Sequence, residues 1–327
     1  MGKASRGKAS AGKASAGNGK AATGRQQKIA AQRAEARRAE VRNRVLLAAG
    51  SIVAVLAVVL TFVLVKADAK PGTAPLASNG PTGAALASVV KDVTHVPATV
   101  LDKVGAGQIT PSSIGTVNPA GTDYLVPVSG SPLTSAGKPE LLYVGANFCP
   151  YCAAQRWAMI VALSRFGTFS GLSTIHSSTT DSPADIASWT FYGAKYTSKY
   201  LSFASVEETK NYRTGNSASP DVGYVPLQAP NSAQQALLAK YDSNYIPFID
   251  VANKYVQVGN LPPYGPQLLQ GMSWSQIAQA MQDPDSAIAQ CVDASANYLT
   301  AAILKVTGNQ PASVCTPAIK KLEAQLG

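Results

Sequence analysis

Histidine and cysteine, which often bind metals or act as nucleophiles, are scarce in this chain. Its 327 residues include two histidines, His95 and His176, and four cysteines. Neither histidine has neighbours in a metal-binding or triad pattern, so both are interpreted as surface or packing residues. A zinc site needs four ligands, and only one pair of cysteines is closely spaced. We therefore expect neither a metal nor another cofactor.

Acidic residues are rare at one end of the chain. The formal net charge is +10, but residues 1–44 hold twelve of the 28 Lys and Arg and only two of the 18 Asp and Glu. Residues 45–327 then carry sixteen charges of each sign and are neutral. The basic excess describes a tail, so we expect no nucleic-acid partner.

Residues 1–44 also lack the large apolar groups that a folded core requires. Gly-Lys-Ala-Ser recurs at Gly2, Gly7 and Gly12, and such low-complexity sequence is typical of disorder. Residues 28–44 are rich in Ala, Arg, Gln and Glu, which favour a solvated helix. We predict a disordered basic tail that ends in a juxtamembrane helix.

The next segment has no charged residue. Val45–Val65 consists mostly of Val, Leu, Ala and Ile, over the roughly 20 positions that a transmembrane helix needs. Because the basic cluster precedes it, the positive-inside rule places the tail in the cytoplasm and the rest outside. The alternative is a cleaved signal peptide, with Ala67-Asp68-Ala69 as the cleavage site, and it also exports the domain. We favour a retained single-pass anchor in the cell membrane, because the run is too long for a signal peptide.

The remaining chain reads as a linker, a mixed α/β domain and a helical extension. Residues 66–83 are rich in Pro, Gly, Ala and Ser, as in flexible linkers. Periodicity predicts strands over 141–146, 172–176, 201–206, 245–251 and 255–258, and helices over 84–93, 98–104, 150–166, 233–241 and 273–281. We expect turns and short strands over 110–139 and a polar loop over 210–229. The domain would span 84–285 and the C-terminal helical extension 286–327.

Cys149-Pro150-Tyr151-Cys152 follows a predicted strand and opens a predicted helix. Residues i and i+3 lie on one helical face, so the two thiols can form a disulfide. Free N–H groups and the helix dipole favour a thiolate at Cys149, which would attack, whereas Cys152 would resolve the mixed disulfide. Pro150 suits the first helical position. The alternatives are a static disulfide and half of a zinc site.

Two stretches resemble known proteins. Tyr245-Ile246-Pro247-Phe248-Ile249-Asp250, followed by Val258-Gly259, resembles the thioredoxin segment in which a cis-proline begins a strand facing the active-site disulfide. This resemblance implies that Pro247 faces the cysteines and that Ile246 offers its backbone to a bound substrate segment.

The stretch Tyr143–Trp157, continuing to Phe169, resembles a family of membrane-anchored, thioredoxin-like proteins known as a domain of unknown function. The likeness runs from about residue 89 to the C-terminus. It implies a thioredoxin-like fold with an N-terminal extension, insertions and C-terminal helices.

The chain departs from thioredoxins at Tyr143, where they carry a buried Asp that moves the proton of the resolving thiol. Efficient reductase behaviour is therefore not expected. The central dipeptide Pro150-Tyr151 is common in glutaredoxins and indicates an intermediate potential, on the order of −200 mV. Arg156, one turn after Cys152, suits two roles: a salt-bridge partner or a cation that tunes the thiols.

The other two cysteines lie in the C-terminal extension. Cys291 falls inside a helix predicted over 286–306, and Cys315 precedes Thr316-Pro317, where a last helix begins. A structural disulfide between them would close a loop of about 25 residues and add about 3 kcal/mol by chain entropy. The alternative is a pair that relays electrons to Cys149.

The leading hypothesis is an exported, membrane-anchored thiol–disulfide oxidoreductase. Its partners would be exported client proteins with thiols or disulfides and a membrane redox partner that resets the cysteines. The alternative is a binding module, in which the same fold presents a peptide groove and the disulfide is merely structural. Trapping of mixed disulfides would separate the two.

Overall fold

The computed structural model describes residues 80–109, 123–213, 223–241, 245–258 and 264–326. The predicted tail, transmembrane helix and most of the linker lie outside these ranges. Among the described helices, none combines the length and the apolar character needed to cross a membrane. The chain divides into two compact units near residue 76, and the description below concerns the second unit, residues 77–327.

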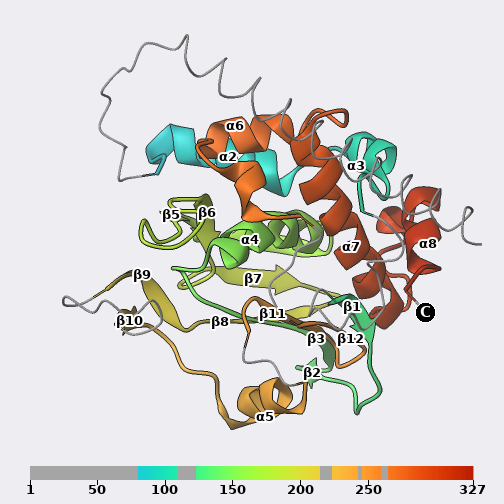
Figure 1. Ribbon diagram of the computed structural model, residues 1–327. Helices are drawn as coiled ribbons and strands as arrows, with labels where there is room; N and C mark the ends of the chain where they lie inside the picture. The colour runs from blue at the N-terminus through green and yellow to red at the C-terminus, as the bar shows by residue number, and fades with distance from the viewer. Residues whose placement is uncertain (1–79, 110–122, 214–222, 242–244, 259–263, 327) are drawn as a thin grey trace, which may run out of the picture. The chain divides into compact units, whose positions relative to one another are not determined.

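A mixed sheet forms the centre of this unit (Figure 1). Its strands are β3 (Lys138–Gly145), β8 (Ser202–Glu207), β11 (Phe248–Val251), β12 (Tyr255–Val258) and β1 (Asp123–Pro127), in the order β1-β12-β11-β3-β8. The β3–β8 pair is parallel, and β3–β11, β11–β12 and β12–β1 are antiparallel. The short β2 (Thr134–Ser135) pairs with the start of β3, across a turn at Ala136 and Gly137. Both turn residues have positive φ, as two-residue hairpins require.

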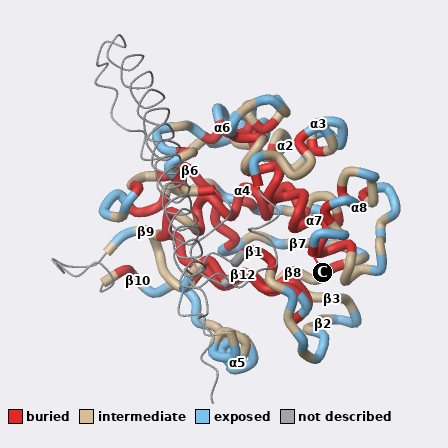
Figure 2. The backbone as a smooth tube through the Cα atoms, turned by 45° about the vertical axis from the view of Figure 1, so that its right-hand side comes forward, coloured by how far each residue is buried: buried red, intermediate tan, exposed pale blue. Residues whose placement is uncertain are grey.

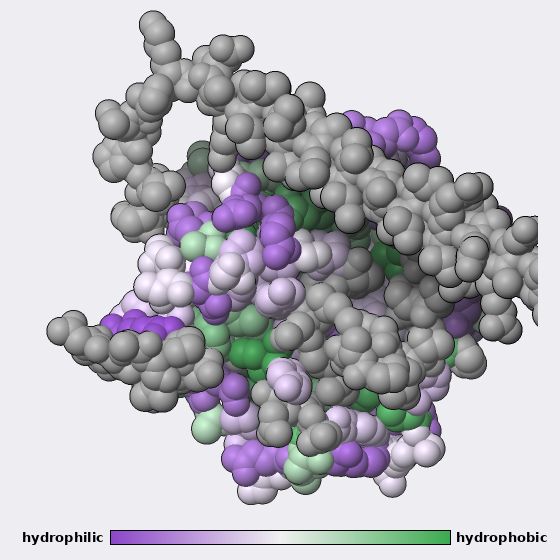
Figure 3. All heavy atoms as spheres, in the orientation of Figure 1, coloured by the Kyte–Doolittle hydropathy of each residue, from purple (hydrophilic) through white to green (hydrophobic). Residues whose placement is uncertain are grey.

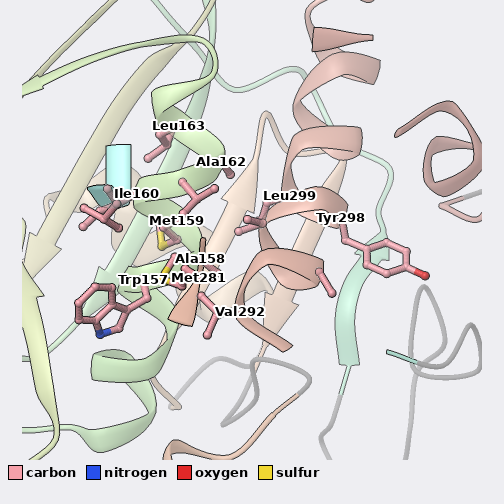
Figure 4. Packing of buried hydrophobic residues seen from close by; sticks show 14 of the residues in the cluster. Trp157, Ala158, Met159, Ile160, Ala162, Leu163, Met281, Val292, Tyr298 and Leu299 are labelled. Atoms are coloured by element: carbon pink, nitrogen blue, oxygen red, sulfur yellow. The ribbon is translucent and has the colours of Figure 1, made fainter. Parts of the chain in front are cut away.

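One face of the sheet is covered by α4 (Pro150–Ser164), which is buried at 13 of its 15 positions. A helix that is apolar on all sides must be surrounded by other elements. In this fold, α7 (Ala294–Val306), α2 (Gly83–Thr94) and β6 (Ala187–Thr190) pack around it. Figure 4 shows Leu299 of α7 pointing toward α4, close to Met159. The largest apolar core of the described chain therefore lies between the sheet and the C-terminal helices.

The opposite face of the sheet carries a smaller core, formed by Leu142, Val144, Val206, Phe248 and Val256. Helix α5 (Ser232–Lys240) covers it with Leu237 and Leu238. No residue of α5 is fully buried, and Figure 2 shows α5 in blue and tan at the bottom, apart from the red α4 and α7. The sheet thus lies between two helical layers of unequal depth.

The described chain has seven α-helices. Besides those above, they are α3 (Ala98–Val104), α6 (Trp274–Ala280) and α8 (Pro317–Glu323). Ser273 caps α6 by accepting from the Gln276 N–H, and Thr316 caps α8. The predicted helix over 286–306 begins instead as a π-helix, Ala289–Asp293, before α7. Short 3₁₀ helices form at Pro266–Leu269 and Ala312–Val314.

Three two-stranded ribbons lie outside the main sheet. They are β4 (Gly167–Ser170) with β7 (Lys195–Ser198), β5 (Ser173–His176) with β6, and β9 (Thr209–Arg213) with β10 (Tyr224–Pro226). The last ribbon corrects the polar loop predicted over 210–229. Strand β9 has no apolar alternation, so nothing in its own sequence predicts the backbone pairing with β10.

Asp250 makes the stability of this unit depend on pH. It is fully buried in β11; Oδ1 accepts from the Asn253 N–H at 2.5 Å, and Oδ2 has no partner. Burial raises the pKa of this carboxyl to about 6. Because its unfolded value is about 4, the folded state holds the proton more tightly. The resulting stability is complete below about pH 4 and is lost as the pH rises through about 6.

Replacing Asp250 with Asn should remove this pH dependence and raise the free energy of unfolding at pH 7 by about 3 kcal/mol. Urea unfolding near pH 4 and pH 7 measures both effects. The matched control is Asp283→Asn, at an exposed position, which should keep the wild-type pH dependence. An unchanged pH dependence in Asp250→Asn would contradict the assignment.

Candidate functional site

The loop from β3 into α4 places the predicted cysteine pair at a strand-to-helix junction. Cys149 is the N-cap residue of α4, and its Sγ accepts from the Cys152 N–H at 3.2 Å. Pro150 occupies the first helical turn, where its missing N–H leaves no hydrogen bond unmade. The junction predicted from the sequence is therefore present, with one sulfur at the helix entrance and the other one turn inside.

The two thiols have different surroundings. Cys149 is 5% exposed and Cys152 is fully buried. Burial alone would raise the pKa of Cys149, but hydrogen bonds from Cys152 and the Tyr151 N–H, together with the charge of Arg156, lower it below its ordinary value. Burial, reinforced by Cys149, raises the pKa of Cys152 well above its ordinary value. The first sulfur is thus the more easily ionised.

The segment before β11 lies against the first cysteine. The carbonyl oxygen of Ile246 is 3.9 Å from Cys149 Sγ, and the Ile246–Pro247 peptide bond is cis, as predicted. Tyr245, one residue earlier, is 60% exposed. The structure thus brings Ile246 and Pro247 against Cys149 and Cys152. Ile246 lies 97 residues after Cys149 in the sequence.

A buried ion pair lies behind the cysteines. Arg156 Nε donates to Glu207 Oε1 at 2.9 Å, and Nη2 donates to Glu207 Oε2 at 2.6 Å. Nη2 also donates to the Ala146 carbonyl at 2.8 Å, and the Phe191 N–H donates to Glu207 Oε1. Both charged side chains are fully buried. Arg156 therefore has both roles that its sequence position left open, since its charge also lowers the pKa of Cys149.

Tyr143 lies beside this ion pair. Its ring centroid is 5.7 Å from the Arg156 guanidinium carbon, and its buried hydroxyl has no hydrogen-bond partner. A Cβ added to Gly145 would lie 2.1 Å from Tyr143 Oη and 3.1 Å from Cys152 Sγ. The hydroxyl and the sulfur therefore border the same small space, which only glycine leaves open.

Aromatic residues hold the loop that precedes Cys149. Phe148 stacks on Tyr224 of β10, with ring centroids 4.1 Å apart and planes at 10°. The Arg213 guanidinium carbon lies 4.5 Å from the Tyr224 ring centroid. The Ser178 N–H also donates to the Phe148 carbonyl at 2.8 Å. The β9–β10 ribbon thus positions the entrance of α4.

Sequence reasoning missed three contributors to this site: Glu207, Gly145 and Tyr224. Glu207 directly follows the apolar strand predicted over 201–206. An acid at the end of a buried strand is a signal, because buried charges are normally paired, but Glu208 follows directly and the sequence does not tell which of the two acids is buried. Tyr224 lies in a segment predicted as a loop, which gave no comparable signal.

Both histidines lie away from the cysteines' contacts described above. His176 pairs with Asp185 at 3.1 Å and meets Trp274 edge to face, and His95 Nδ1 lies within hydrogen-bond distance of Thr94 and Lys91 at its own helix end. Within the described ranges, no three His, Cys, Asp or Glu side chains are grouped to hold a metal ion.

The disulfide predicted between Cys291 and Cys315 is not formed, and both are free thiols. Cys291 lies in the π-helix before α7, with Sγ 3.7 Å from Gln108 Oε1. Cys315 follows the other end of α7, with Sγ 3.3 Å from Asn309 Oδ1. A helix of 13 residues is about 20 Å long, whereas a disulfide needs Cα atoms within about 7 Å. The predicted staple is therefore corrected; the electron-relay alternative stays a prediction.

The fold and the site define a mixed α/β protein with a buried Cys-x-x-Cys pair at the start of its central helix. The chain belongs to the family described as Domain of unknown function (DUF929), whose model matches residues 124–305. This membership confirms the family resemblance noted in the sequence at that level. No curated protein and no solved structure matches the chain.

Proposed function

We propose that this unit is a thioredoxin-like domain and that the protein is a membrane-anchored, extracytoplasmic thiol–disulfide oxidoreductase. The strand order β8-β3-β11-β12 supports the fold, because thioredoxin-like cores combine one parallel strand pair with an antiparallel hairpin. Helix α4 lies in the chain between β3 and β8, the two parallel strands, and β11 begins directly after Pro247. The basic segment before the apolar run supports the anchor and the export of this domain.

The observation that carries the proposed activity is the asymmetry between the two thiols. Cys149, at the N-cap of α4, has a lowered pKa, whereas burial raises that of Cys152. A thiolate is the nucleophile in thiol–disulfide exchange. Cys149 would form the mixed disulfide with a client protein, and Cys152 would displace the client's sulfur from it. A membrane redox partner would then restore the starting state of the pair.

The surroundings of Cys149 suit an extended client segment. The Ile246 carbonyl faces Cys149 Sγ, and the exposed Tyr245 precedes Ile246 in the chain. Figure 3 shows an apolar area, with polar residues above and below it, over the region where β8 lies in Figure 1. Backbone pairing with a strand edge gives affinity without demanding one client sequence.

A peptide-binding module with an inert disulfide is the alternative, and one observation favours it. Both cysteines are at most 5% exposed, so a client must approach closely before its sulfur can reach Cys149. In that case the pair would only hold the start of α4 in place.

The experiment that separates these functions is the Cys152→Ser variant of the full chain. If Cys149 is a nucleophile, this variant should accumulate mixed disulfides with exported proteins, because the resolving thiol is missing. Electrophoresis with and without reductant detects them as bands that reductant removes.

The matched controls are Cys149→Ser, which removes the nucleophile, and Cys315→Ser, which removes a thiol outside the site. Neither should trap clients through the site. Equal trapping by Cys152→Ser and Cys149→Ser would rule out the enzyme and leave the binding module.

A further inference from the structure

The residues behind the cysteine pair have polar atoms that the fold itself does not use. Arg156 Nη1 and the Tyr143 hydroxyl are both buried and both lack a hydrogen-bond partner. Buried donors without partners are costly, and each one in a native fold calls for an explanation. Their position beside Cys152 suggests that the partner is formed during the reaction.

The fold brings both side chains close to the same sulfur. Cys152 and Arg156 are four residues apart on α4, so they share one face of the helix. Tyr143 reaches that face from β3, and its Oη borders the space beside Gly145 that Cys152 Sγ also borders. The Tyr143 ring also lies against the guanidinium group. Two unused donors therefore flank one buried sulfur.

Glu207 orients this arrangement and is not placed to act as a base. Its Oε1 accepts from Arg156 Nε and the Phe191 N–H, and its Oε2 accepts from Arg156 Nη2. The carboxylate thus fixes the guanidinium with Nη1 left free. The titratable or charged groups next to Cys152 are Cys149, Tyr143, Arg156 and, through Arg156, Glu207.

We infer that Arg156 and Tyr143 form an anion pocket for the sulfur of Cys152, which suits the oxidised pair to accept electrons from protein dithiols. This inference rests on the proposed function. It identifies the client class as reduced proteins that gain a disulfide. Arg156 and Tyr143 act on the client through Cys152 and are positioning residues.

The reaction in this direction balances as follows. A client thiolate attacks Cys149 Sγ, the Cys149–Cys152 bond breaks, and Cys152 leaves with the electron pair as a thiolate. The pocket stabilises that anion until it takes a proton. The second client thiol then loses its proton and attacks the client sulfur of the mixed disulfide, releasing the Cys149 thiolate. The client is oxidised by two electrons and the pair is reduced by two.

Both leaving sulfurs are stabilised in this direction. The Cys149 thiolate is stabilised as a leaving group by the N–H groups at the start of α4, and the Cys152 thiolate is stabilised by the two donors of the pocket. A better-stabilised thiolate is a better leaving group, and the lowered pKa of Cys149, which stabilises the reduced form, makes the pair a stronger oxidant. The same pocket increases the thiolate fraction of Cys152 and so speeds the reverse reaction, in which Cys152 attacks a mixed disulfide at Cys149. The rate of that attack is a direct assay of the pocket.

The assay uses the reduced full chain with Cys291 and Cys315 replaced by Ser, mixed with 5,5′-dithiobis(2-nitrobenzoate). Attack by Cys149 releases one thionitrobenzoate, and attack by Cys152 on the resulting mixed disulfide releases a second. Stopped-flow absorbance resolves the two phases. The first phase reports on the proposed function, and the pH profile of the second reports on the pocket.

Two variants test the pocket. Tyr143→Phe removes an oxygen that has no hydrogen-bond partner, so the fold should persist. Arg156→Met/Glu207→Gln removes both members of the ion pair together. In each, the second phase should slow about tenfold near neutral pH with its midpoint displaced upward, since a hydrogen bond to a charged group has about that effect.

The matched control is Tyr196→Phe, which removes a half-buried hydroxyl that donates to the Leu163 carbonyl at the far end of α4. It should leave both phases unchanged. Unchanged second phases in both test variants would overturn the pocket. A slower second phase without a shifted pH midpoint would overturn the pocket too. The substitution would then have changed the position of Cys152 but not its pKa. Loss of the first phase in the parent chain would instead overturn the proposed function.

Discussion

Iodoacetamide should alkylate Cys149 of the reduced protein below pH 8 and at least about a hundredfold faster than Cys152 at pH 7. Burial works against ionisation at both sulfurs. At Cys149 it is outweighed by the hydrogen bonds from Cys152 and by Arg156, so the pKa falls. At Cys152 burial dominates and the pKa rises. Mass spectrometry of the labelled peptides across a pH series measures the two rates separately.

The control for this prediction is the same labelling in concentrated urea. Unfolding removes the N-cap geometry and the burial together, so the two rates should converge. Equal rates in the folded protein, with both midpoints near the free-cysteine value of about 8.5, would show that Cys149 is not activated. The binding module would then be the better account.

Replacing Arg156 with Met should destabilise the protein by about 3–5 kcal/mol, because it leaves the carboxylate of Glu207 buried without its counterion. The double variant Arg156→Met/Glu207→Gln should recover most of this loss, since the amide oxygen can still accept from the Phe191 N–H. Urea unfolding of the three proteins gives the free energies. A double variant as unstable as the single one would show that the loss comes from packing rather than from charge.

The exposed ion pair Lys103–Asp285 provides the comparison. Its N–O distance is 2.7 Å, as short as that of a buried pair, but its side chains are 59% and 73% exposed. Lys103→Ala should therefore cost less than about 1 kcal/mol. The contrast isolates burial as the reason for the large effect at Arg156.

Local signals were strong enough to predict the parts of the fold that carry the cysteines. The apolar run over 141–146 falls in β3, which ends one residue earlier, at Gly145, and the helix predicted to begin at Pro150 is α4. The hairpin around Ala252-Asn253-Lys254 joins β11 and β12, although β11 begins only at Phe248. In each case, hydrophobic periodicity, proline and turn residues point to the same structure.

Features that depend on distant partners could not be predicted in this way. Arg156 and Glu207 are 51 residues apart in sequence, and their pairing follows from the parallel alignment of β3 and β8. Strand β9 is polar and gains its structure from β10. The pairing of Cys291 with Cys315 was inferred from their number and their helices. It failed because sequence alone does not tell which ends of two helices meet.

The space beside Gly145 also bears on how oxidants can act on this protein. A single methyl carbon there would approach Cys152 Sγ to 3.1 Å, so glutathione attached to Cys152 would have no room. The oxygen atoms of a sulfinic or sulfonic acid at Cys152 Sγ would clash with the same surrounding atoms. Cys149, at the helix entrance, is the sulfur on which oxygen atoms or a small thiol can be added. Irreversible oxidative damage would therefore begin at the attacking thiol and would remove the protein's nucleophile before its resolving partner.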